Sequence, residues 1–161
     1  MGMKLDGLAN FGKALVALQA DLPEIMDELV VEEGLFAVKQ ACRICTEENI
    51  VSSNAYRSNF MCGTKAIRVG VNYKIDVFNN LDYAKHLEYG FRGHFVPGHW
   101  DGDSFIYQPK DPQGGMFVDS LIPGHYTLER AVNATKRTQN ARLQRNFEDK
   151  LKKRGYMKYF K

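Results

Sequence analysis

The sequence has no long apolar run. No stretch of its 161 residues reaches the ~18 consecutive apolar residues that a membrane-spanning helix needs. The initial segment, MGMKLDGLANFGKAL, lacks the apolar core and cleavage site of a secretory signal. We therefore expect a protein that is made and kept in a cytoplasm and has no membrane partner. Hydrophobic residues still make up 44% of the chain, enough for a real core, and the length predicts a single domain over residues 1–161.

Cysteine is scarce as well. Three cysteines are present, Cys42, Cys45 and Cys62, and an odd number in a chain without a signal argues against a disulfide framework. The C-x2-C spacing of the first two suggests a zinc or redox site, but no second pair accompanies it. Because the pair falls in a helical run, KQACRICTEEN, we favour cysteines that pack as small buried hydrophobes.

The usual catalytic signatures are missing too. There is no G-x-S-x-G, P-loop, G-x-G-x-x-G or H-E-x-x-H motif. All four histidines, His86, His94, His99 and His125, nevertheless fall within residues 86–125, and Asp101 and Asp103 lie among them. A small metal-dependent hydrolase built on this loop is therefore the alternative function. Their spacing matches no known ligand pattern, so we favour a protein that is not an enzyme and has no metal or cofactor.

Hydrophobic spacing predicts an α+β protein. Residues 1–49 should form N-terminal helices, one from Leu8 to Leu18 and a second that starts at Asp21–Glu24 and runs to about Glu48. A small antiparallel sheet with a short helix should occupy residues 60–90, with strands at 66–71 and 74–78 and the helix at 81–90. A long extended arm or hairpin should follow over 91–123, with strands at 104–108 and 116–122, then a helix over 126–154 and a basic tail over 155–161.

One short pattern occurs twice in this part of the chain. FVPGHW at 95–100 and LIPGHY at 121–126 each place Pro-Gly-His before an aromatic residue. Proline fixes φ and glycine can supply a positive φ, so we predict two structural turns, at Pro97-Gly98 and Pro123-Gly124. The second turn should set the angle at which the last helix begins.

The net charge of +3 hides an uneven distribution. Residues 136–161 contain ten Lys or Arg and two acids, while the rest of the chain contains twelve bases and seventeen acids. A basic helix on an acidic body predicts a solvated face, contact with DNA phosphates, or contact with an acidic partner. The candidate contact residues are Lys136, Arg137, Arg142, Arg145, Lys152, Lys153 and Arg154.

Three short motifs follow one another in a fixed order. They are Ala-Tyr-Arg-Ser at 55–58, Y-A-x-x-L-E-x-G at 83–90 and P-G-x-Y-x-L-x-x-A at 123–131. In this order the chain resembles, over roughly residues 5–150, the gene-ten-type family of tailed bacteriophages, which comprises tail-component and head–tail joining proteins. The arm between Arg92 and Ser120 is longer than in the shortest family members, and the final KKRGYMKYFK lies beyond the pattern.

The resemblance implies a structural virion protein at the head–tail junction, assembled in the host cytoplasm. It implies a homo-oligomeric ring, a hexamer by preference and a dodecamer as the alternative, whose lumen phage DNA crosses. The partners would be the head-closure protein and a tail terminator or tail tube protein. Neck and tail-completion roles stay open, as does the type of tail. In such a ring the aromatic residues of the arm would anchor the subunit interface, namely Phe91, Phe95, Trp100, Phe105, Tyr107 and Phe117.

Overall fold

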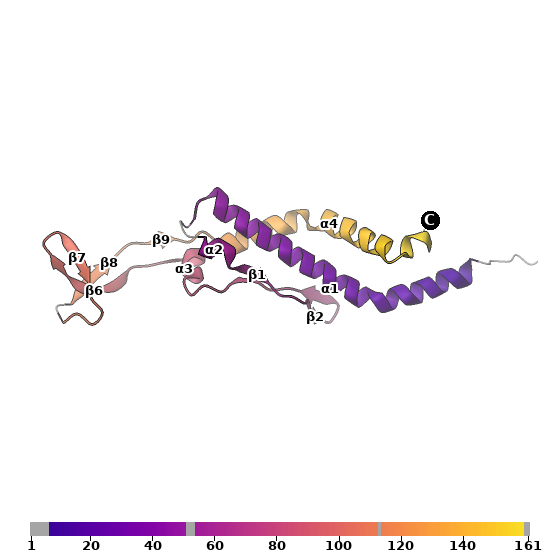
Figure 1. Ribbon diagram of the computed structural model, residues 1–161, viewed down its shortest axis with the longest axis horizontal. Helices are drawn as coiled ribbons and strands as arrows, with labels where there is room; N and C mark the ends of the chain where they lie inside the picture. The colour runs from indigo at the N-terminus through magenta and orange to yellow at the C-terminus, as the bar shows by residue number, and fades with distance from the viewer. Residues whose placement is uncertain (1–6, 51–53, 113, 160–161) are drawn as a thin grey trace, which may run out of the picture. The chain divides into compact units, whose positions relative to one another are not determined.

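The computed structural model describes residues 7–50, 54–112 and 114–159 and has the predicted α+β class (Figure 1). The chain divides into two compact units, which we describe separately. One comprises residues 1–80 together with 127–161, and the other comprises residues 81–126. In the described part of the chain, no helix combines the length and the apolar character that a membrane crossing requires.

Two long helices build the first unit. Helix α1 spans Leu8–Glu47 and helix α4 spans Thr127–Lys153, followed by the 3-10 helix η1 at Tyr156–Tyr159. Their core is the cluster of Ile25, Leu29, Leu151 and Tyr156. The predicted final helix is therefore confirmed to within one residue at each end.

The predicted helix start at Asp21–Glu24 is wrong, because α1 continues through Pro23. A proline inside a helix removes one hydrogen bond and crowds the preceding turn, at a cost of about 3 kcal/mol. Leu18 and Met26, on either side of Pro23, both pack against the same core cluster, which holds the helix together across the proline. The helix changes direction in its N-terminal half (Figure 1), as expected of a proline kink.

Two small antiparallel sheets lie in the same unit. Strand β1 (Phe60–Cys62), which was not predicted, follows the short helix α2 (Ala55–Ser58) and pairs with β4 (Val77–Asn79). Strand β2 (Ile67–Val69) pairs with β3 (Asn72–Lys74). The predicted strand at 66–71 is thus present as β2, but the one at 74–78 is wrong as a single strand.

The break in that strand has a packing reason. A β-carbon on Gly34 of α1 would lie 3.1 Å from side-chain atoms of Ile75 and of Cys62, so Ile75 packs closely on the helix. Gly63 N–H then donates to the carbonyl of Asp76 at 3.0 Å, which starts the second ladder. The side chains keep alternating through residues 73–79 while the hydrogen-bonding partner changes.

The second unit starts with a short helix and continues into the arm. Helix α3 (Ala84–Tyr89) ends at Gly90 with φ of 76°, as predicted. Strand β5 (Gly90–Phe91) pairs with β9 (Ile122–Pro123), and β6 (His94–Asp101) lies between β7 (Ser104–Tyr107) and β8 (Gly115–Val118). The predicted strands at 104–108 and 116–122 are present in part, but each pairs with β6 instead of with the other.

The predicted turn at Pro97-Gly98 is wrong, because both residues lie inside β6. The Pro97 carbonyl accepts from Gln108 N–H, and Gly98 N–H donates to the Gly114 carbonyl on the opposite side. β6 therefore changes its partner from β8 to β7 at the peptide unit between Pro97 and Gly98. The nitrogen and carbonyl of one strand residue point the same way, so the Pro97 nitrogen faces away from β8 and its missing N–H costs no bond to that strand.

The predicted turn at Pro123-Gly124 also needs correction. Pro123 pairs with Gly90 in the β5–β9 ladder, and Gly124 does not have a positive φ. Glycine is needed there for close approach, since a β-carbon on it would lie 2.2 Å from the Glu88 carbonyl oxygen. The positive φ before α4 belongs to Tyr126, at 51°.

Candidate functional site

The arm exposes most of the aromatic residues that were predicted as interface anchors. Phe95, Trp100, Tyr107 and Phe117 keep between 58% and 64% of their accessible surface. Phe95 lies directly opposite Phe117 in the β6–β8 ladder. Among the residues of β6, β7 and β8, only Gly98 is buried. A sheet that leaves its large aromatic side chains in water is typical of a surface that another molecule covers.

The hairpin of β6 and β7 ends in a segment that we call the arm tip, residues 100–105. Trp100 lies opposite Phe105, and their rings meet edge to face with centroids 5.4 Å apart. Asp101 ends β6 and Asp103 lies in the turn, and both are exposed and without an ionic partner in the described part of the chain. The arm tip is therefore aromatic and acidic.

At the other end of β6 is an open cavity of about 440 Å³, which we call the base pocket. Phe91 packs edge to face between His86 and His94, with centroids 5.9 Å from each ring. The remaining lining residues are Tyr83, Leu87 and Arg92. The lining residues are mostly aromatic or apolar and include no acidic side chain. Arg92 makes the rim of the pocket basic.

The histidines and aspartates of the alternative hydrolase are spread over the second unit. His86 and His94 line the base pocket, Asp101 and Asp103 lie at the arm tip, and His125 N–H donates to the Leu87 carbonyl at 2.8 Å. Across the described ranges, no group of three or more His, Cys, Asp or Glu is arranged to hold a metal ion.

His99 has a different carboxylate partner from those considered in the sequence. Its Nδ1 lies 2.5 Å from Oδ2 of Asp111, whose side chain is 1% exposed. No sequence pattern indicated this pair, because the two residues are twelve positions apart and meet only when the β6–β7 hairpin and the loop after it fold back. The contact ties this loop to β6.

The second candidate surface, the basic helix α4, turns several of its cations toward the acidic residues of α1. Arg142 donates from Nε to Glu33 at 2.6 Å and from Nη2 to the other carboxylate oxygen at 2.5 Å. The two side chains are only 10% and 8% exposed, and the guanidinium also lies 3.6 Å from the centre of the Phe36 ring. Arg142 is therefore part of the helix interface.

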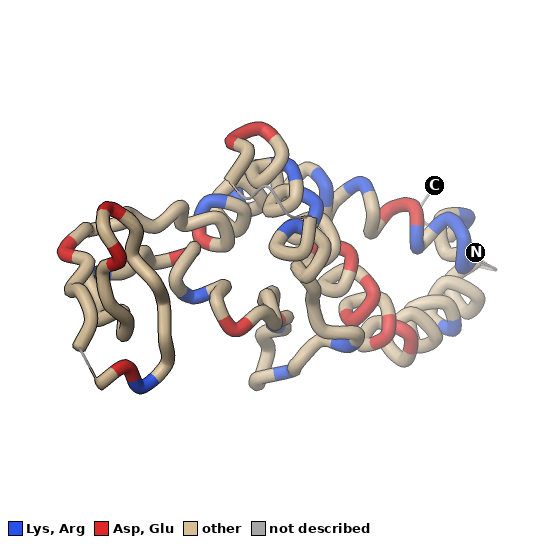
Figure 2. Tube along the Cα trace, turned by 60° about the vertical axis from the view of Figure 1, so that its left-hand side comes forward, with Lys and Arg blue, Asp and Glu red and all other residues tan. Residues whose placement is uncertain are grey.

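The same pairing continues toward the end of α4, where Figure 2 shows basic and acidic segments close together. Lys150 donates to Glu28 at 2.6 Å and to Glu32 at 2.7 Å. The hydrogen bond from Lys150 holds the pKa of Glu28 below its ordinary value. Arg154 contacts Glu24 and Glu28 at 3.0 Å, and its hydrogen bond to Glu24 raises the pKa of Arg154.

Some cations of α4 remain available after these pairings. Lys152 has only an exposed contact of 3.4 Å with Asp149, which lies three residues earlier in α4. The others are exposed and have no ionic partner among the residues that the structure describes: Lys136, Arg137, Arg145 and Lys153. These five residues, which we call the open basic set, are the part of the predicted contact set that a partner can reach.

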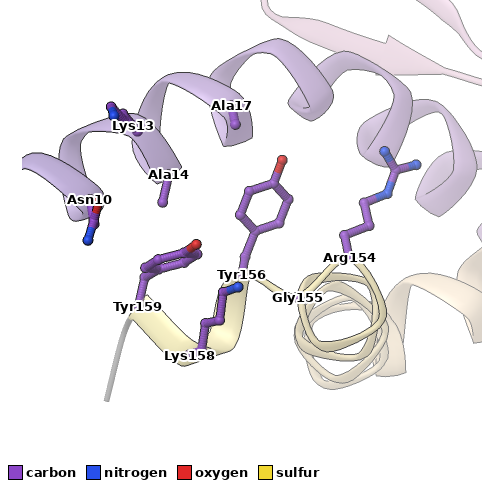
Figure 3. Close-up of a pocket in the computed structure, with 9 residues that line it drawn as sticks. All are labelled: Asn10, Lys13, Ala14, Ala17, Arg154, Gly155, Tyr156, Lys158 and Tyr159. Carbon is purple, nitrogen blue, oxygen red and sulfur yellow. The ribbon is translucent and has the colours of Figure 1, made fainter.

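A pocket of about 280 Å³ lies between the start of α1 and η1 (Figure 3). Tyr156 and Tyr159 face the small residues Ala14 and Ala17 across it. Tyr156 donates its hydroxyl to Asp21 at 2.8 Å, which raises the pKa of this phenol. Lys13 and Lys158 also line the pocket, so this end of the unit extends the basic surface.

The cysteines fit the prediction of packed thiols. Cys45 is buried, and Cys42 Sγ donates to the carbonyl of Arg57 at 3.2 Å. Burial raises the pKa of the Cys42 thiol, and it also raises that of Cys62. All three cysteines are free thiols.

Comparisons with known proteins give one partial match. A segment is 39% identical over 57 residues to the uncharacterized protein YqbI of Bacillus subtilis (strain 168). The match covers 28% of this chain and 32% of YqbI, so the chain spans about a third of that relative. No protein-family profile matches the chain. No solved structure matches it.

Proposed function

We propose that this chain is a structural virion protein of a tailed phage, a ring-forming neck or tail-completion component at the head–tail junction. The observation that carries the proposal is the uncovered aromatic sheet of the arm. A ring component needs a surface that is buried only on assembly, and β6, β7 and β8 offer one with four exposed aromatic anchors.

The motifs that carry the resemblance also have consistent structural roles. The Leu87 carbonyl accepts from His125 N–H, and the Glu88 carbonyl accepts from Tyr126 N–H at 3.0 Å. The second and third motifs therefore meet through backbone bonds, and Gly124 is the residue that allows their close approach. This supports treating the second and third motifs as parts of one local structure.

In the proposed ring, the open basic set of α4 contacts phage DNA in the lumen or an acidic neighbouring protein. Contacts to phosphates depend strongly on salt and ignore base sequence. Neutralising Lys136, Arg137 and Arg145 together should therefore lower DNA affinity and flatten its salt dependence. The matched control neutralises Lys39, Lys65 and Lys85, which are exposed lysines outside α4. Equal losses in the two variants would remove α4 from the DNA-binding proposal.

Native mass spectrometry at low and moderate salt, with metal analysis of the same sample, tests the proposal as a whole. We expect a ring of six or twelve copies, or a monomer that enters a ring when head-closure or tail protein is added. A stable monomer that holds one zinc or manganese ion would overturn it and favour the hydrolase alternative at residues 86–125.

A further inference from the structure

The arm tip and the base pocket are complementary in chemistry. The tip presents Trp100 with 59% of its surface exposed, next to Asp101 and Asp103. The pocket is an apolar cavity of about 440 Å³ with aromatic walls and the exposed guanidinium of Arg92 on its rim. A buried indole beside a guanidinium gains both apolar burial and a cation–π contact. The carboxylates of Asp101 and Asp103 would approach together with Trp100 and would meet Arg92, with no acidic residue among those that line the pocket.

A chain cannot bring its own tip to its own pocket within the arm. His94 lines the pocket at the first position of β6, and Trp100 lies near the other end of the same strand. The six residue steps from His94 to Trp100 correspond to roughly 20 Å of extended backbone. Whatever fills the pocket must come from outside this strand.

We infer that the arm tip of one copy seats in the base pocket of the next copy. The inference rests on the proposed ring and names the contact that closes it. Tip and pocket are different surfaces on each chain, so the contact is heterologous, and repetition by a constant rotation closes a ring without free ends. Trp100 is the anchor of this contact, and the Arg92–aspartate pairs set its orientation.

A charge exchange across the contact is the sharpest test. Arg92→Glu places a negative charge on the rim, and Asp101→Lys with Asp103→Lys makes the tip positive. Each variant alone should associate about tenfold or more weakly than the unmodified chain, measured by sedimentation velocity at several concentrations. Mixed together, both contacts are again attractive, so assembly should return with the two variants alternating in equal numbers.

The single tryptophan of the chain reports on the same contact. Because Trp100 moves from water into an apolar pocket, its emission should shift to shorter wavelength on association. The shift should be absent in the Arg92→Glu variant and return in the mixture. The matched control is Asp76→Lys with Asp149→Lys, which makes the same change of charge at exposed acids of the other unit. This control should assemble normally.

The outcomes separate this contact from the ring itself. Rings that form equally well with the Arg92→Glu and tip variants would overturn the tip-in-pocket contact and leave the ring proposal standing. The tip-in-pocket contact would also be overturned, and the ring proposal would stand, if the emission of Trp100 shifted on adding a different protein and not on association with a second copy of this chain. A chain that stays monomeric at every concentration and with every head or tail partner would overturn both.

Discussion

Replacing Arg142 with methionine should strongly destabilise the unit formed by α1 and α4. The guanidinium is 10% exposed and makes two short hydrogen bonds to Glu33, itself 8% exposed. It also bonds the Thr135 carbonyl at 3.2 Å and the Thr138 hydroxyl at 2.8 Å. Methionine keeps much of the apolar contact with Phe36 but leaves the Glu33 carboxylate buried without its counter-charge.

The expected cost is about 3–5 kcal/mol of unfolding free energy, the usual penalty for removing one member of a buried ion pair. Most of this penalty belongs to the stranded Glu33. A second substitution, Glu33→Leu, removes that charge, so the double variant should recover most of the lost stability. The loss of stability in the double variant should therefore be smaller than the sum of the losses in the two single variants.

Urea unfolding followed by helical circular dichroism, at one fixed protein concentration, measures the effect. With a slope of about 1–3 kcal/mol per molar urea, the Arg142→Met midpoint should fall by at least about 1 M. Arg43→Met is the matched control, because its pair with Glu47 is exposed and its loss should leave the midpoint unchanged. A double variant no more stable than Arg142→Met alone would refute the stranded-charge reasoning.

Three further outcomes follow from the same contacts. Folding lowers the pKa of Glu28, so the contribution of this carboxylate to stability is complete above the ordinary value of 4.5 and is lost as the pH falls through its lower folded-state value. Melting temperatures measured from pH 7 to 3 should show this loss in the unmodified chain and less of it in Lys150→Met. Gly98→Ala should disrupt the arm, because φ is 152° and the new β-carbon would lie 2.1 Å from the Ile106 carbonyl oxygen. Gly102→Ala should cost much less, because its β-carbon meets no neighbour and only the strain of a φ of 59° remains; tryptophan fluorescence reports on both. The half-buried thiol of Cys42 should react slowly with a disulfide reagent at pH 7 and quickly in urea, and equal rates would contradict its raised pKa.

Helical spacing predicted α4 to within one residue at each end and the outer limits of α1, because both have a clear apolar pattern. It placed the end of α3 correctly at Gly90 but its start three residues too early. The error within α1 came from Pro23, which carries the local signals of a helix start. Local sequence could not show that Leu18 and Met26 both pack on the core contributed by α4 and η1. Tertiary packing outweighed the local preference.

The strands of the arm were harder to predict for a related reason. Pro97-Gly98 has the composition of a turn, and β6 was missed because of it. The structure uses the same two residues at the one peptide where a strand changes partner, and there a missing N–H and a positive φ are both accommodated. Composition identified the special backbone position but not the pairing around it.

The charge asymmetry shows where sequence reasoning about partners reaches its limit. A count of charges makes residues 136–161 a basic surface that awaits an acidic partner, yet Arg142, Lys150 and Arg154 already have theirs on α1. These three cations are used within the unit, so an external partner has fewer of them to contact, chiefly the open basic set. The arm differs, since Phe95, Trp100, Tyr107 and Phe117 remain exposed. Among the described residues, Asp101 and Asp103 have no ionic partner. The surface least satisfied within one chain is therefore the arm, and assembly is where we expect its contacts to be completed.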